Sequence, residues 1–115
     1  MGVELTDNIG KFIGRFDELS DKARYQLTEQ ILADSNKHAR RDSGTMILSS
    51  IDKTDRTNGV IVWDTPYAKR VYFTGTPSTD KNPDAELMWV QVARDRYSKD
   101  WMVIFKNLAE KEILR

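Results

Sequence analysis

The sequence predicts an α+β fold, in which a small antiparallel, meander-like sheet packs against N-terminal and C-terminal helices. Three observations lead to this prediction. Apolar residues recur at helical spacing in residues 20–41 and again in residues 84–114. The β-branched run VIVW at residues 60–63 directly follows the turn signal Asn58-Gly59. A chain of 115 residues, of which 39% are hydrophobic, is expected to form a single domain.

Residues 1–19 predict a short N-terminal helix or arm. Their apolar residues are separated by three, four and seven positions, as on one face of a helix. Gly10 and Gly14 interrupt this segment, and each glycine lowers helix stability by up to about 1 kcal/mol relative to alanine. The apolar positions are Ile9, Phe12, Ile13 and Phe16.

Residues 20–41 give the strongest helix prediction. Ser20 is a suitable N-cap, because its side-chain oxygen can accept a hydrogen bond from a free amide of the first turn. From Ala23 to Ile31 an apolar residue recurs every four positions. The small-residue turn at residues 42–44 then predicts the end of the helix, because it includes a glycine.

Residues 45–75 are expected to form the sheet region. Met46, Leu48 and Ile51 predict the first strand of a hairpin, and residues 60–63 predict the second. Pro66 ends that second strand, because proline lacks the amide hydrogen needed to continue it. The residues after Pro66 favour a helical turn almost as strongly as a further strand, so both possibilities remain open here.

Residues 76–83 are predicted to be a loop, and residues 84–114 a C-terminal helical region. Asn82 or Asp84 is expected to cap its first helix. Two apolar stripes follow, one ending at about Ala93 and one beginning at Trp101, with a polar stretch between them. The pattern fits either one continuous helix or a break within the polar stretch.

No arrangement of residues in the sequence predicts catalysis. His38 is the single histidine, and on one helix Asp34 and Asp42 would share its face, as in an oriented base or part of a metal site. A polar helix face near a C-terminus explains the same pattern. The chain has no cysteine and no second histidine, so we predict no enzyme activity, no metal site and no cofactor. Ser43-Gly44-Thr45 lacks the flanking glycines of a nucleophile turn.

The charge of the chain is balanced, with 18 lysines and arginines against 18 aspartates and glutamates. Proteins that bind duplex nucleic acid usually gather cations on one face, because displaced counterions supply much of the affinity. Folding could still bring several basic residues together. These candidates are Arg40, Arg41, Arg56, Lys69 and Arg70.

The aromatic residues of the segment WDTPYAKRVYFTG offer both core and interface candidates. Trp63 follows a β-branched run and is expected in the core. Tyr67 and Tyr72 lie beside Lys69 and Arg70 in the sequence, so partial burial and a place in a protein interface are both open for them.

The order of these segments resembles the minor capsid protein 2 family of tailed bacteriophages of Gram-positive hosts. It is similar, more distantly, to head-tail joining and tail-completion proteins of long-tailed phages. The segments that carry the resemblance, over roughly residues 20–112, are DSGTMILSSI, VIVWDTPYAKRVYFTG and NPDAELMWVQVARDRYSKDW. The most specific residues are Tyr67-Ala68, Phe73 and Gly75-Thr76, followed by Trp89 and Trp101 in the last helical region.

This resemblance implies a non-enzymatic virion protein, made in the cytoplasm of the host bacterium. It would assemble with copies of itself into a six- or twelve-fold ring at the head-tail junction. Its neighbours would be the portal or adaptor and the tail-terminator proteins, with weak non-specific DNA contact in the lumen and no membrane. The expected contact residues are Arg40, Arg41, Tyr67, Tyr72 and Phe73.

Two other functions remain as alternatives at this point. A small nucleic-acid-binding or regulatory protein would use the five basic residues named above, and its binding to duplexes would weaken with salt. An enzyme that depends on His38 is the third possibility.

Overall fold

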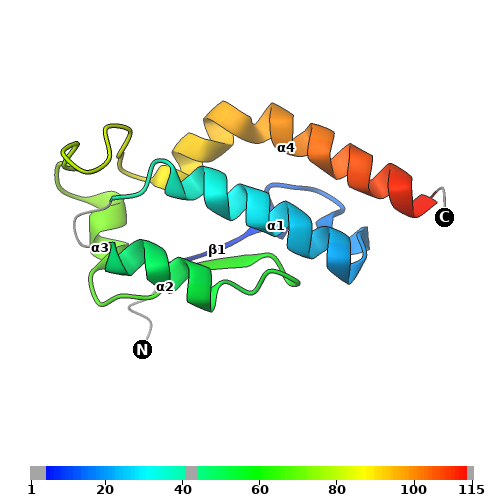
Figure 1. The fold of residues 1–115 in the computed structure, drawn as a ribbon, viewed down its shortest axis with the longest axis horizontal. Helices are drawn as coiled ribbons and strands as arrows, with labels where there is room; N and C mark the ends of the chain where they lie inside the picture. Colours follow the sequence, from blue (N-terminus) through cyan, green and yellow to red (C-terminus); the bar gives the residue numbers. More distant parts are fainter. Residues whose placement is uncertain (1–4, 41–43, 114–115) are drawn as a thin grey trace.

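The computed structural model describes residues 5–40 and 44–113 and confirms the α+β fold, with a two-stranded antiparallel sheet and helices around it (Figure 1). Two 3-10 turns, η1 and η2, lie between the first strand and the first helix. In chain order the elements are β1 (Leu5–Asn8), η1 (Ile9–Lys11), η2 (Phe16–Glu18), α1 (Asp21–Asn36), α2 (Thr45–Lys53), β2 (Val60–Trp63), α3 (Ala68–Phe73) and α4 (Trp89–Ile113).

The sheet pairs the two strands β1 and β2, with Leu5 opposite Trp63 and Asn8 opposite Val60. The predicted hairpin over residues 46–63, and with it the meander, is therefore wrong. Its first half is the helix α2, which buries Met46, Ile47 and Ser50 on one side. The partner of β2 is β1, more than fifty residues earlier in the chain, and a local sequence pattern does not reveal such a distant pairing.

The predicted short helix in residues 1–19 is also wrong for the described residues 5–19, which hold β1 and the two 3-10 turns. The Asn8 side chain accepts a hydrogen bond from the amide of Gly10 and so starts η1 directly after the strand. Three of the four apolar positions, Ile9, Ile13 and Phe16, are nevertheless buried. These apolar residues were predicted to share one face of a helix, and they are buried although their backbone is not α-helical.

Helix α1 begins as predicted, since the Ser20 side-chain oxygen accepts the amide of Ala23 at 3.2 Å. The helix ends at Asn36, several residues before the predicted end at residue 41. Beyond it, the Asn82 side chain donates to the carbonyls of Lys37 and Ala39 and replaces continued helical bonds. The turn residues Asp42 and Ser43 lie outside the described part of the chain, and Gly44, with φ of 78°, precedes α2.

Helix α4 is continuous through its polar middle, so there is no break at Ser98. It begins at Trp89, and neither Asn82 nor Asp84 caps it, because both lie in the loop before it. Met88, with φ of 50°, has a left-handed conformation that is unusual for a residue with a side chain and separates loop from helix. This loop spans the residues between α3 and α4 and includes the predicted loop 76–83.

The core lies where α1 packs between α4 on one side and α2 with the sheet on the other (Figure 1). Trp63, Trp89 and Trp101 are all fully buried there. The indole nitrogen of Trp63 donates to the Asn36 side chain at 2.9 Å. That of Trp101 donates to the Asp34 carboxylate at 2.8 Å, and both bonds therefore attach the core to α1.

Candidate functional site

Helix α3 divides its side chains between the core and the surface. Ala68 and Tyr72 are buried, and they lie four residues apart on one face of the helix. Lys69, Arg70 and Phe73 are exposed and share the other face by the same spacing. We call these three exposed residues the α3 face. The helix thus presents one aromatic ring and two cations to solvent.

Tyr72 and Phe73 have opposite surroundings although they are neighbours in the chain. Tyr72 is 6% exposed, and its ring meets that of Trp89 edge-on at 4.6 Å between centroids. Burial raises the pKa of the Tyr72 phenol, and hydrogen bonding to the backbone of Gln91 opposes this in part. Phe73 is 51% exposed. Of these two predicted contact residues, Phe73 is therefore the one whose ring is open to a partner.

Arg40 holds the end of α3 in place. Its guanidinium donates to the carbonyls of Val71 at 3.3 Å, Thr74 at 3.2 Å and Thr76 at 3.5 Å. These carbonyls lie in and just after the last turn of the helix, where they have no partner within the helix. Arg40 therefore anchors the end of α3, and its guanidinium is bound to these backbone carbonyls. Its neighbour Arg41, the other half of the predicted contact corner, lies outside the described residues.

The other predicted residues lie in two different places. Tyr67 is half-buried against the core just before α3. Arg56 forms an ion pair with Glu29 of α1, donates to the Ile51 carbonyl and lies over the Tyr25 ring at 5.8 Å. Tyr25 and Glu29 lie in the first half and near the middle of α1, whereas Arg40 follows its end, so the structure does not bring Arg56 beside Arg40. The predicted basic residues therefore form no single cluster within the described chain.

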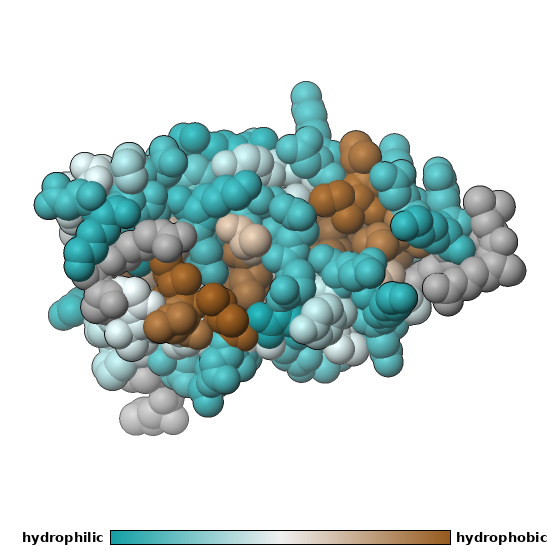
Figure 2. All heavy atoms as spheres, viewed as in Figure 1, coloured by the Kyte–Doolittle hydropathy of each residue, from teal (hydrophilic) through white to brown (hydrophobic). Residues whose placement is uncertain are grey.

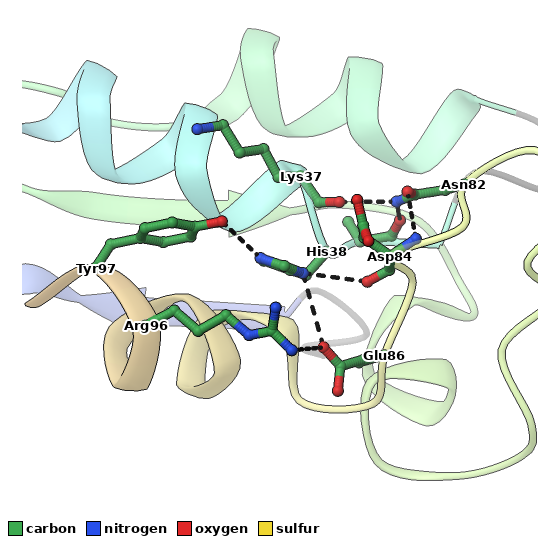
Figure 3. Close-up of polar contacts among 8 residues, drawn as sticks. Lys37, His38, Asn82, Asp84, Glu86, Arg96 and Tyr97 are labelled. Carbon is green, nitrogen blue, oxygen red and sulfur yellow. Dashed lines mark hydrogen bonds and ion pairs between the residues drawn. The ribbon is translucent and has the colours of Figure 1, made fainter.

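His38 is 2% exposed and joins the end of α1 to the loop before α4 (Figure 3). Its Nδ1 lies 3.1 Å from the Asp84 carbonyl oxygen, and its Nε2 lies 3.0 Å from the Tyr97 hydroxyl. A carbonyl oxygen can only accept, so Nδ1 carries the hydrogen, and in the neutral ring Nε2 accepts from Tyr97. The Glu86 carboxylate lies 3.7 Å from Nδ1 and also binds Arg96.

The Asn82 side chain completes this connection, and Figure 3 shows it bonded to the backbone of Lys37. The Asn82 amide nitrogen binds the carbonyls of Lys37 and Ala39, and its oxygen accepts from the amide of Asp84. The amide of Glu86 donates to the carbonyl of His38 at 3.0 Å. His38 and Asn82 together fix the loop onto α1, and both nitrogens of the His38 ring are used for this.

The predicted shared face of Asp34, His38 and Asp42 is not formed. Helix α1 ends at Asn36, so His38 lies beyond the helix and does not share a helix face with Asp34. Asp42 lies outside the described residues. The Asp34 carboxylate is 4% exposed and binds Trp101 and, at 2.9 Å, Lys37. This hydrogen bond raises the pKa of the Lys37 ammonium. In the described chain, no three acidic or histidine side chains are grouped as a metal site would require.

Two apolar surfaces were missed by the sequence prediction. On α2, Leu48 and Ile51 point to solvent, because the buried side of this helix is the opposite one. On α4, Met102 and Val103 are exposed, and Met102 lines a groove. Helical spacing would have revealed Leu48 and Ile51 as a pair, had residues 45–53 been interpreted as a helix.

The sequence matches no protein-family model, no curated protein and no solved structure. None of the helices within the described residues is long and apolar enough to cross a membrane. The function is therefore inferred from the residues, their geometry and the resemblance of the segments given above.

Proposed function

We propose that this chain is a structural subunit of the virion of a long-tailed bacteriophage, placed in the neck between portal and tail. The observation that carries the proposal is the arrangement of the segment WDTPYAKRVYFTG, on which the resemblance depends most. In the fold, this segment combines the buried last residue of β2, Trp63, with the exposed α3 face. It is attached to the core by Tyr72 and to the end of α1 by Arg40. An exposed helix face that is anchored in this way suits a part that binds other proteins.

The chemistry of the α3 face supports protein contact. An exposed aromatic ring flanked by cations is typical of interface centres, where aromatic residues and arginine are enriched. Phe73 supplies the ring, and Lys69 and Arg70 supply the charges. In a virion neck, the partner would be a neighbouring subunit of the ring, the portal or adaptor, or the tail terminator.

The test is a nonsense mutation in this gene, in a phage that encodes the chain. Lysates grown on non-suppressing bacteria are examined by electron microscopy, and growth on a suppressor strain is the control. We expect filled heads and separate tails without suppression, because the neck joins the two. Infectious virions in normal numbers on the non-suppressing host would overturn the proposal.

A pair of point variants tests the α3 face separately. Phe73→Ala should reduce the yield of joined particles at unchanged protein level, because half of the ring is exposed and open to a partner while one edge-on contact joins it to Tyr72. Tyr25→Ala is the matched control, since Tyr25 is an exposed aromatic residue of α1, distant in sequence from α3. Equal particle yields for Phe73→Ala and the wild type would remove the α3 face from the proposed interface.

A further inference from the structure

A groove of about 570 Å³ opens beside the C-terminal half of α4. Its floor is apolar, and its rim carries two cations and two carboxylates, of which Arg15 and Glu18 pair at 2.8 Å. The apolar floor consists of Leu19, Met102, Phe105 and Ala109, and the charged rim of Arg15, Glu18, Lys106 and Glu110. We call this feature the α4 groove. Grooves of roughly 300–1,000 Å³ hold small molecules, so two aliphatic side chains fit here.

A projecting apolar feature lies elsewhere on the same molecule. Leu48 is 66% exposed and Ile51 is 51% exposed, three residues apart on the outer face of α2. We call this pair the α2 ridge. Asp52 and Lys53 beside it form an ion pair at 3.7 Å. The ridge therefore resembles the groove in its charges: apolar residues are bordered by one positive and one negative side chain.

Figure 2 shows that both apolar surfaces belong to one face of the molecule. Apolar side chains gather over α2 and, separately, between the first half of α1 and the second half of α4. We propose that the α2 ridge of one copy of this chain docks into the α4 groove of a second copy. In a dimer with two-fold symmetry, the α2 ridge of each copy would occupy the α4 groove of the other copy.

The charges favour a second copy over a partner of strong charge. A highly acidic or basic partner would meet like charges on the rim of the groove, which carries both signs equally. The neighbours of the α2 ridge also carry both signs. Asp52 can face Arg15 or Lys106, and Lys53 can face Glu18 or Glu110. The inference does not depend on the neck function, because it concerns only contacts between copies.

Cysteine cross-linking tests the contact directly, because the chain has no cysteine of its own. Purified Leu48→Cys is mixed with a tagged Met102→Cys variant and oxidised mildly. A disulfide forms only when the two Cβ atoms come within about 4 Å, so the mixed dimer should exceed the dimers of either variant alone by roughly fivefold. Thr76→Cys, exposed on the loop, replaces Met102→Cys in the control.

Self-association is measured on the same proteins by sedimentation equilibrium. Leu48→Asp should weaken it by at least about tenfold, because a carboxylate would enter an apolar groove. Thr76→Asp should leave it unchanged. Circular dichroism verifies the fold, and Leu48 is exposed enough for the substitution to leave the core intact.

Two results would overturn the proposal. One is a wild-type protein that stays monomeric up to about 1 mM and gives no mixed disulfide above the control. The other is a Leu48→Cys dimer as abundant as the mixed one, because ridges would then meet ridges. Failure of the neck function would appear in the phage lysates and not in these measurements, so the two proposals are separable.

Discussion

At the scale of single residues, burial decides which of two adjacent aromatic side chains serves the core. The sequence does not show which of the adjacent aromatic residues Tyr72 and Phe73 is buried. In the structure, the Tyr72 ring contacts Trp89, and the Phe73 ring is half exposed to solvent. The consequence for Tyr72 is electrostatic. Its neutral phenol fits the core, whereas the phenolate would lose its hydration there, and the pKa is raised accordingly.

Replacement of Tyr72 by phenylalanine should change how stability depends on pH. The pKa of Tyr72 in the folded protein is raised above its unfolded value of about 10. The stability that the neutral, buried Tyr72 phenol contributes is therefore fully present below pH 10 and is lost as pH rises through the folded pKa. Tyr72→Phe should therefore lose stability less steeply than the wild type above pH 10. Urea unfolding between pH 7 and 11 measures this, with Tyr25→Phe as control. Parallel curves for Tyr72→Phe and wild type would contradict the expectation.

Replacement of His38 by phenylalanine should release the loop before α4. The Asp84 carbonyl and the Tyr97 hydroxyl would both lose a partner, at a cost of roughly 1–3 kcal/mol in unfolding free energy. Hydrogen exchange at the amides of Glu86 and Met88 should accelerate more than exchange in α1. Tyr97→Phe removes one of the two bonds and should have a smaller effect. Unchanged loop exchange in His38→Phe would show that the loop is held by other contacts.

At the scale of elements, the sequence predicted what is local and missed what depends on distant partners. The start of α1 could be predicted, because Ser20 and the four-residue apolar repeat are contiguous. Residues 46–51 contain apolar positions that fit a strand or a helix, and the choice is made by β1, which occupies the edge of β2. The extended conformation of Leu5–Asn8 has the same cause.

The candidate site shows the same division. The sequence singled out the segment after Pro66 but fitted a helical turn and a strand almost equally well. Only when this segment is known to be the helix α3 can Tyr72 be assigned to its buried face and Phe73 to its exposed face. The role of Arg40 depends on carbonyls more than thirty residues further along the chain. Contacts of this kind can be identified only from the structure, which places the residues after α1 next to the end of α3.

The turn before β2 provides a test at the same scale. Gly59 has φ of 69°, and a Cβ atom there would lie 2.5 Å from the Phe16 ring. Gly59→Ala should lower the free energy of unfolding by about 2 kcal/mol or more, from left-handed strain together with the clash. Gly14→Ala is the matched control, because nothing lies within 4 Å of its Cβ position. Equal urea midpoints for the two variants would contradict this account of the turn.

At the scale of the whole molecule, the predicted basic residues that the structure describes do not form one cluster. Arg56 is paired with Glu29 along α1, and Arg40 is bound to carbonyls after α3. Lys69 and Arg70 remain exposed on the α3 face. Of the predicted basic residues that the structure describes, these two are therefore the ones open to phosphates, and we expect duplex binding through them to be weak.

Duplex binding can be measured by fluorescence anisotropy between 25 and 200 mM salt. With about two phosphate contacts, the slope of log K against log salt should be no steeper than about −2, and binding should be negligible near 150 mM. A Lys69→Ala, Arg70→Ala double variant should abolish the residual binding at low salt. Micromolar affinity at 150 mM salt with a steep slope would instead favour the nucleic-acid-binding alternative.

The pairing of β1 with β2 also determines the order in which the molecule can be built during translation. Leu5 is made well before its partner Trp63, which follows only after α1 and α2 have been synthesised. At about 5–20 residues per second, the first strand waits several seconds for its partner. The backbone bonds of the two helices are local and can form in that interval, so the sheet closes late and the nascent strand β1 stays open to chaperones until it does.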